Sequence, residues 1–278
     1  MSETPPPADD ALRTSIGLIG CGAIGTIIAK ALDQGDIPAK LLAVNDINHT
    51  RAEHLIWSLQ RRPTAMTLAG MIATCDFIVE ATTPQAVGGI VEQALQGGRD
   101  ILAMSVAGLL DREDLFDMAG RFERKIYLPA GALAGIDAAR AANVGTVESV
   151  VLSTRKPPRA LAGAPELIAQ GVDPMKITEP TVVFEGTARQ AIRGFPLNVN
   201  VAATLSLACG GADFVQVRII ADPTVDKNIH ELEIIGDCGR ILSRTENVPS
   251  SNPKTSRLAA YSAIAALRQI LKPLVIGA

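Results

Sequence analysis

The chain has 278 residues, of which 47% are hydrophobic and 20% charged, as in an ordinary globular protein. Its length predicts two domains, because single domains typically have about 100–200 residues. The formal net charge is −3 and no block of Lys or Arg stands out, so we expect neither a nucleic-acid surface nor a membrane-binding one.

The N-terminal segment and the cysteines bear on the compartment. Residues 1–14 are polar and rich in proline, and we expect a disordered tail there because the apolar region of a signal peptide is missing. The four cysteines lack the C-x-x-C spacing of a metal or redox site, so we expect reduced thiols, no metal and a cytoplasmic protein.

Strands and helices alternate through the first half of the chain. Strands are predicted at Ser15–Gly20, Leu41–Asp46, Asp76–Ala81, Ile101–Val106 and Lys125–Leu128. Helices are predicted at Ala23–Leu32, Arg51–Gln60, Gln85–Leu95 and Asp111–Phe122. This alternation is typical of a parallel sheet of the Rossmann type, so the fold class is α/β with a dinucleotide-binding domain over residues 15–131.

The pattern changes after Gly131, where fewer helices separate the strands. Strands are predicted at Ser149–Thr154, Thr181–Phe184, Phe214–Ile220 and Ile229–Ile235, with one main helix at Val199–Cys209 and a long surface loop within Arg155–Pro180. We expect residues 132–246 to form a second, α+β domain with an open, mostly antiparallel sheet.

A last helix is well marked. Asn252 suits its N-cap and Pro253 its first position, and apolar residues recur at helical spacing as far as Leu271. Because that apolar face must pack on something, we expect residues 247–278 to return to the first domain.

A glycine-rich motif points to a dinucleotide cofactor. Residues 20–25 read G-x-G-x-x-G between a predicted strand and a predicted helix, the context that separates a cofactor loop from a plain glycine-rich turn. The helix N-terminus would offer N–H groups to the pyrophosphate. The predicted cofactor-binding residues of this loop are Gly20, Cys21, Gly22, Ala23, Ile24 and Gly25.

Two further segments complete the cofactor prediction. Asp46 ends the second predicted strand, 26 residues after Gly20, and favours NAD because a carboxylate there would repel the 2′-phosphate of NADP. His49 and Arg51 would soften that preference, so NADP stays open as a second cofactor, unless they only occupy a solvated loop. Ala81, Thr82 and Thr83 follow the third strand and should line the nicotinamide half.

Four segments of the second half carry a resemblance to a known family. They are Pro129–Ala132 (PAGA), Gly194–Ala203 (GFPLNVNVAA), Asp222–His230 and Asn247–Ser256 (NVPSSNPKTS). With them, the chain resembles the L-aspartate dehydrogenase family from Ile16 to Leu271.

The resemblance implies a reaction, a set of residues and an assembly. Family members oxidise L-aspartate with NAD or NADP to iminoaspartate, which yields oxaloacetate and ammonia and can feed NAD biosynthesis. The family's catalytic histidine corresponds to His230, and its nicotinamide contacts correspond to Ala132 and Asn198. Members are homodimers. Leu197 stands where many members carry a basic residue, a departure that bears on substrate affinity.

The chemistry of the reaction agrees with these positions. Hydride can leave Cα only when the amine is neutral, so a base must take the ammonium proton, and histidine titrates in a suitable range. A lone histidine on a strand face is more often a core residue than a catalytic one, so a purely structural role is the alternative for His230. His49 and His54 are the other histidines, and both lie in the cofactor half.

Two substrate carboxylates require positive potential, which the N-terminus of the last helix would supply. The predicted substrate-binding residues are Asn198, Asn252, Lys254, Thr255 and Ser256. The alternative is simple capping by Asn252 with Lys254 in solvent. Rival functions are a reductase of the dihydrodipicolinate reductase or homoserine dehydrogenase type, and an NAD-sensing protein without turnover.

Overall fold

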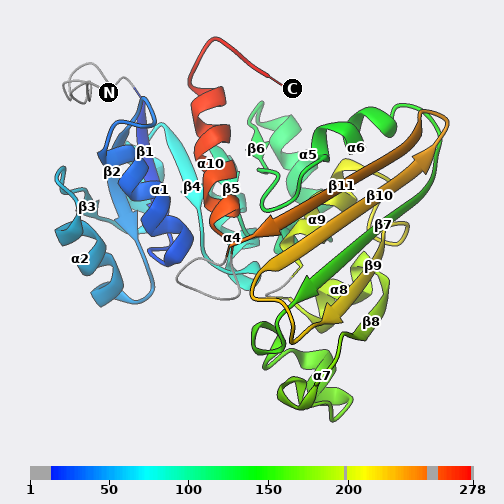
Figure 1. Cartoon of the computed structure of the whole chain (residues 1–278). Coiled ribbons are helices and arrows are strands. Elements are labelled where there is room, and N and C mark those ends of the chain that lie inside the picture. Colours follow the sequence, from blue (N-terminus) through cyan, green and yellow to red (C-terminus); the bar gives the residue numbers. More distant parts are fainter. Residues whose placement is uncertain (1–13, 197–198, 249–255, 277–278) are drawn as a thin grey trace, which may run out of the picture. The chain divides into compact units, whose positions relative to one another are not determined.

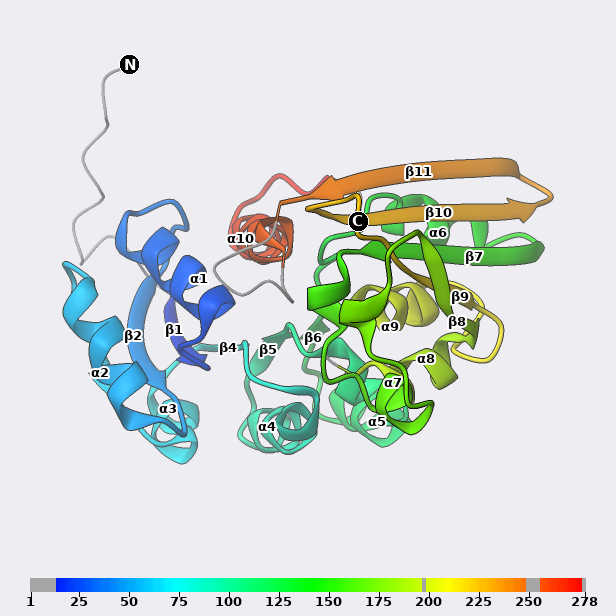
Figure 2. The same ribbon diagram turned by 60° about the horizontal axis from the view of Figure 1, so that its bottom comes forward.

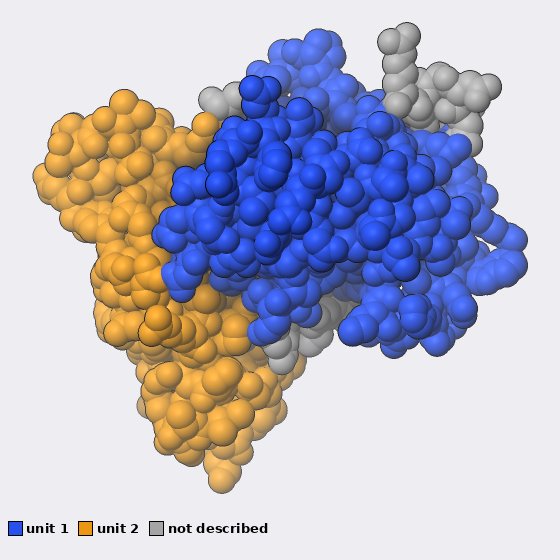
Figure 3. Space-filling model, turned by 180° about the vertical axis from the view of Figure 1, so that it is seen from behind, with its two compact units in different colours: residues 1–129, 260–276 blue, residues 130–259, 277–278 orange. Residues whose placement is uncertain are grey.

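The structure is a computed structural model that describes residues 14–196, 199–248 and 256–276. Two compact units make up the chain, and Figure 3 colours them separately. Unit 1 comprises Met1–Pro129 and Ala260–Ile276, and unit 2 comprises Ala130–Ala259 and Gly277–Ala278. The chain therefore returns to unit 1 at Ala260, later than the predicted position 247, because the last strand of unit 2 runs to Asn247. No described helix is long and apolar enough to cross a membrane.

Unit 1 is built on a six-stranded parallel sheet with the order β3-β2-β1-β4-β5-β6. The strands are β1 (Ser15–Ile19), β2 (Lys40–Asn45), β3 (Thr64–Ala65), β4 (Phe77–Glu80), β5 (Asp100–Ala103) and β6 (Ile126–Tyr127). This confirms the predicted Rossmann-type sheet. The sequence did not predict β3, whose two residues are too few to show a periodic pattern.

Helices lie on both faces of this sheet, as Figure 2 shows for α1 and α10 on one side and α3 and α4 on the other. Their bounds are α1 (Ala23–Asp33), α2 (His49–Ser58), α3 (Leu68–Thr74), α4 (Pro84–Gln96), the 3-10 helix η2 (Val106–Leu109), α5 (Glu113–Arg121) and α10 (Arg257–Ile270). The unpredicted α3 begins where the Thr67 side chain accepts a hydrogen bond from Gly70 N.

The start of α10 differs from the prediction. The helix begins at Arg257, and Ser256 precedes it in a β-bridge, with Arg257 N donating to Val248 O. Ser256 therefore does not lie in the first helical turn, as a start at Pro253 required. The predicted cap and start at Asn252 and Pro253 lie outside the described residues.

Unit 2 contains a five-stranded sheet with the order β11-β10-β7-β9-β8 (Figure 1). The strands are β7 (Val147–Lys156), β8 (Thr181–Thr187), β9 (Gln216–Ala221), β10 (Asn228–Gly236) and β11 (Gly239–Asn247). All neighbours are antiparallel except β7 and β9, so the predicted mostly antiparallel sheet is confirmed. The sequence did not predict β11, whose residues alternate between exposed and half-buried rather than between polar and apolar.

The helices of unit 2 are α6 (Ile136–Ala142), η3 (Pro158–Leu161), α7 (Pro165–Ala169), η4 (Pro174–Lys176), α8 (Ala188–Gly194) and α9 (Asn200–Ala208). The predicted main helix is thus confirmed as α9. The predicted long loop is wrong in part, because η3, α7 and η4 fold within it. Prolines begin all three of these short helices, and proline suits the first helical position.

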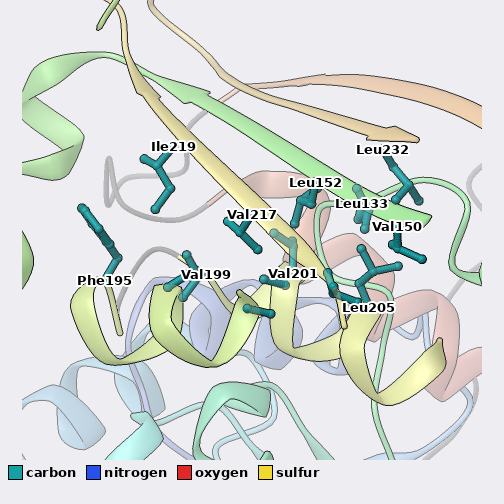
Figure 4. Packing of buried hydrophobic residues seen from close by; sticks show 14 of the residues in the cluster. Leu133, Val150, Leu152, Phe195, Val199, Val201, Leu205, Val217, Ile219 and Leu232 are labelled. Carbon is teal, nitrogen blue, oxygen red and sulfur yellow. The ribbon is translucent and has the colours of Figure 1, made fainter. Parts of the chain in front are cut away.

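The core of unit 2 lies between α9 and one face of the sheet, which we call the inner face. Figure 4 shows Leu152 and Val217 of the sheet above Val201 and Leu205 of α9. Alternate residues of each strand share this face, because side chains of a strand point to opposite sides in turn. The inner face therefore places residues two positions apart in β7 and β10 next to the same core.

Candidate active site

The glycine-rich loop between β1 and α1 has the shape of a cofactor cradle. Gly20 adopts φ +96°, and a Cβ there would lie 2.3 Å from Ala81 O, so a side chain at this position is excluded. A Cβ at Gly25 would lie 1.9 Å from Gly20 O, which shows how closely α1 approaches the turn. A Cβ at Gly22 would meet nothing within 4 Å and would project into open space.

The N-terminus of α1 is suited to an anion. Gly22 is its N-cap and provides no side-chain cap, so the N–H groups of Ala23 and Ile24 point along the helix dipole toward the open space beside Gly22. The two tight glycines and the open one match the three roles of a dinucleotide loop. These residues fit the pyrophosphate of a nicotinamide dinucleotide, which would be held by the backbone from Gly20 to Gly25.

Asp46 lies directly after β2 and is tied to the same loop. Its Oδ2 accepts a hydrogen bond from Cys21 N at 2.8 Å, and its Oδ1 accepts one from Asn48 N at 2.8 Å. Arg51 lies 3.8 Å away, and the carboxylate is buried. A carboxylate has about four acceptor positions, so this one can also accept from a ribose hydroxyl.

Glu80 is a buried acid that sequence reasoning did not select. It ends β4 with no exposed surface, and its carboxylate accepts hydrogen bonds from Thr82 N and Oγ1 and from Ser105 N and Oγ. Met104 N is a further donor. Glu80 thus fixes the loop at Ala81–Thr83 against the end of β5. The only signal in the sequence was an acid at the end of an apolar strand.

His230 lies on the inner face of unit 2, at the start of β10. It is 3% exposed, and its Nδ1 lies 3.0 Å from the hydroxyl of Thr154, which is opposite it on β7. Burial, with a smaller contribution from the charge of Lys156, lowers the pKa of His230 from 6.5 to about 3. The imidazole is therefore neutral near pH 7 and has one nitrogen available as a base.

Lys156 is a second chemical group on this face, and sequence reasoning missed it. It ends β7 two residues after Thr154, is 3% exposed, and burial lowers its pKa to about 8. The predicted strand stopped at Thr154, which placed Lys156 in a surface loop. A lysine in a loop gives no sign of burial, since lysine is ordinarily exposed.

Ala132 and Ser256 meet the same end of the sheet. Ala132 O accepts hydrogen bonds from Asn247 Nδ2 at 3.0 Å and Thr245 Oγ1 at 3.1 Å, and Thr245 is the partner of His230 on β11. Ser256 Oγ lies 3.5 Å from Nδ2 of Asn228, two residues before His230. The structure thus brings these two predicted positions to the strand ends that carry His230. The predicted Asn198, Asn252, Lys254 and Thr255 lie outside the described residues.

A Rossmann-type unit with a dinucleotide loop, joined to a unit with a buried histidine on a sheet, defines a nicotinamide-dependent dehydrogenase. Residues 20–129 match the family model "Homoserine dehydrogenase, NAD binding domain", and residues 137–270 match "Aspartate dehydrogenase, C-terminal". The chain is an oxidoreductase that uses NAD.

Comparison with known proteins identifies the family. The chain is 46% identical to L-aspartate dehydrogenase of Methanosarcina barkeri, over 94% of this chain and 98% of that protein. It is 42% identical to L-aspartate dehydrogenase of Bradyrhizobium diazoefficiens, over 97% and 95% of the two chains. It shares its fold with aspartate dehydrogenase of Thermotoga maritima, with a TM-score of 0.71, 24% identity, and coverage of 95% of this chain and 99% of that one. The chain belongs to the L-aspartate dehydrogenase family.

Proposed function

We propose that the chain oxidises L-aspartate with NAD, and also with NADP, to iminoaspartate, which yields oxaloacetate and ammonia. The relatives from Methanosarcina barkeri and Bradyrhizobium diazoefficiens are named L-aspartate dehydrogenases. The observation that supports the proposal is the buried pair of His230 and Thr154 in unit 2, which provides a neutral imidazole. Oxidation of an amine requires a base, and a neutral imidazole can act as one.

His230 is the base of the proposed reaction. If Nδ1–H donates to Thr154 Oγ1, the lone pair of Nε2 is left to take a proton from the substrate ammonium. The neutral amine can then form a C=N bond as the Cα hydrogen leaves with its electron pair. NAD, when bound, supplies the acceptor for that hydride. Addition of water to the imine releases oxaloacetate and ammonia.

The remaining positions of the proposal follow the family resemblance. The loop Gly20–Gly25 and Asp46 would hold the adenosine and pyrophosphate, and Ala81–Thr83 would hold the nicotinamide half. Ala132 and Asn198 would contact the nicotinamide. The substrate would meet Asn198 and the segment from Asn252 to Ser256.

A spectrophotometric screen tests the activity. NADH formation at alkaline pH should be fastest with L-aspartate among the common amino acids. His230→Asn, which keeps a polar group but no titrating nitrogen, should lower kcat by about 10²–10⁴-fold, the usual contribution of a positioned base. His54→Asn on α2 is the matched control, since that histidine is exposed. Full activity of folded His230→Asn would refute the role of this residue.

The same screen separates the rival functions. A protein that only senses NAD would bind the cofactor and show no turnover with any amino acid. A reductase of the dihydrodipicolinate reductase or homoserine dehydrogenase type would not oxidise aspartate, because its own substrate is not among the common amino acids. Fastest turnover with aspartate excludes both.

We propose that the protein is a cytoplasmic homodimer. The support is the outer face of the unit 2 sheet, opposite the side on which Figure 2 shows α8 and α9. Leu242 is 62% exposed there and lines a hollow together with Val151, Ser153 and the charged residues Glu231, Glu233 and Arg244. A second copy would cover this apolar side chain. Light scattering should give twice the chain mass, and Leu242→Glu should shift it toward that of a monomer.

A further inference from the structure

The inner face of the unit 2 sheet becomes polar at one end. Thr154 and Lys156 share this face on β7, and Asn228 and His230 share it on β10, because each pair is two residues apart. His230 pairs with Thr154 in the sheet, and Asn228 and Lys156 stand one position beyond the paired residues Ile229 and Arg155. Lys156 and Asn228 therefore lie beside the His230–Thr154 pair.

The buried charge of Lys156 is unfavourable for folding at this position. The residue is 3% exposed, and transfer of a charge from water into a protein interior is unfavourable unless strong partners compensate it. The neighbouring Arg155 belongs to the opposite face of β7, where its Nη1 lies 2.7 Å from Asp222 Oδ2. Lys156 therefore brings a positive charge to the polar end of the inner face, where a negatively charged substrate could meet it.

Asn228 gives independent evidence for a ligand. The residue is 1% exposed, and its Nδ2 lies 3.5 Å from Ser256 Oγ. Its Oδ1 is buried and accepts no hydrogen bond from any described residue. A buried oxygen without a donor is unfavourable by itself, and an N–H group of a bound molecule would satisfy it.

We propose that Lys156 binds a carboxylate of the substrate while Asn228 Oδ1 accepts a hydrogen bond from the substrate amine. This inference rests on the proposed function and assigns the groups that recognise an amino acid. An ammonium group has three N–H donors, so Lys156 can hold a carboxylate in addition to its contacts within the chain. Together, Lys156 and Asn228 would set the amine beside His230.

Loss of Lys156 should change the kinetic constants differently from loss of the base His230. Lys156 would contribute to binding in the ground state and the transition state alike, so its loss should appear mainly in KM. In Lys156→Met, KM for aspartate and Ki for succinate should rise about 10–100-fold, the usual effect of one charge-assisted hydrogen bond. KM for NAD should stay within about twofold, because the predicted cofactor loop belongs to unit 1.

Two further variants sharpen the test. Lys156→Arg keeps the charge and should recover part of the affinity for succinate. Lys176→Met is the matched control, because Lys176 is an exposed lysine of unit 2 and its removal should change neither constant. Lys156→Gln replaces the methionine variant if circular dichroism shows that Lys156→Met does not fold.

The outcomes separate this inference from the proposed function. Wild-type KM and Ki in a folded, uncharged variant would overturn the role of Lys156, whatever His230 does. Loss of kcat in His230→Asn with an unchanged Ki for succinate would support both. If the wild type does not oxidise aspartate, calorimetry of succinate binding in the presence of NAD still tests the role of Lys156. The inference then requires that Lys156→Met binds succinate more weakly than Lys176→Met does.

Discussion

Thr154 and His230 face each other across β7 and β10, with 3.0 Å between the threonine hydroxyl and Nδ1 of the imidazole. Both side chains are buried, so the hydroxyl replaces water as the partner of this nitrogen. The threonine hydroxyl can accept a hydrogen bond from Nδ1–H, and in that tautomer Nε2 is free of a proton, as the proposed reaction requires.

Replacing this hydroxyl by a methyl group should impair turnover. Thr154→Val keeps the shape of the side chain and removes the partner of Nδ1, so kcat should fall by ~10-fold, the equivalent of one hydrogen bond. KM for NAD should not change. Thr154→Ser retains the hydroxyl and should retain most of the rate. Wild-type kcat in Thr154→Val would show that the backbone alone orients His230.

The pH dependence of the reaction follows from the burial of His230. The sequence led us to expect a base that titrates in the ordinary histidine range, and the structure places its pKa at about 3. In the free enzyme the ring is thus neutral throughout the physiological range, so His230 should contribute no acid limb to kcat/KM near pH 6. Any such limb there should persist in His230→Asn.

A bound substrate should change the pKa of His230. The positive charge of Lys156 is one cause of the low pKa of His230, and a carboxylate beside that lysine would offset it. The pKa of His230 should therefore rise in the substrate complex, so an acid limb should appear in kcat at higher pH than in kcat/KM. Profiles of both constants from pH 4 to 10 measure this. Coincident limbs would contradict it.

Much of unit 1 could be predicted because its signals are local. The glycine spacing from Gly20 to Gly25 lies within one turn, and the strand and helix periods repeat along the chain. The hydrogen bonds of Glu80 could not be predicted in this way. Its partner Ser105 lies 25 residues away and meets it only because β4 and β5 are neighbours in the sheet.

The contacts of the candidate site in unit 2 were even harder to predict from the sequence. His230 was identified through a family resemblance, and nothing near it in the sequence points to Thr154, which is 76 residues away. Lys156 was hidden for another reason. Two consecutive charged residues, Arg155 and Lys156, after an apolar strand are the usual sign that the strand has ended, whereas here β7 continues to Lys156 and the lysine is buried.

Cofactor choice should depend on Asp46. Its carboxylate also holds the loop through Cys21 N, so Asp46→Ser should weaken both cofactors and shift the ratio of their affinities toward NADP by about 1–2 kcal/mol. Asp46→Asn keeps an acceptor oxygen for the loop and removes the charge, so it should show the shift with less overall loss. Titration of NAD and NADP against the three proteins measures both effects. An unchanged ratio would place Asp46 away from the ribose.

The buried charge of Lys156 should also lower the stability of the fold. Burial brings its pKa from 10.5 to about 8, so the unfolded chain holds this proton more tightly than the folded protein does. The protonated lysine thus costs folding free energy on the order of 1–3 kcal/mol at pH 7, and the cost fades as pH rises from about 8 to 10.5. Lys156→Met should remove it and raise Tm by roughly 2–10 °C at pH 7.

Thermal unfolding at two pH values distinguishes this cost from a general effect of the substitution. The difference in Tm between Lys156→Met and the wild type should shrink from pH 7 to pH 10, because the wild-type lysine becomes neutral over that range in the folded state. Lys156→Arg stays charged and should show no gain at either pH. A methionine variant less stable than the wild type at pH 7 would mean that the lysine supports the fold. A more stable variant that binds aspartate poorly would mean that its charge is kept for the substrate.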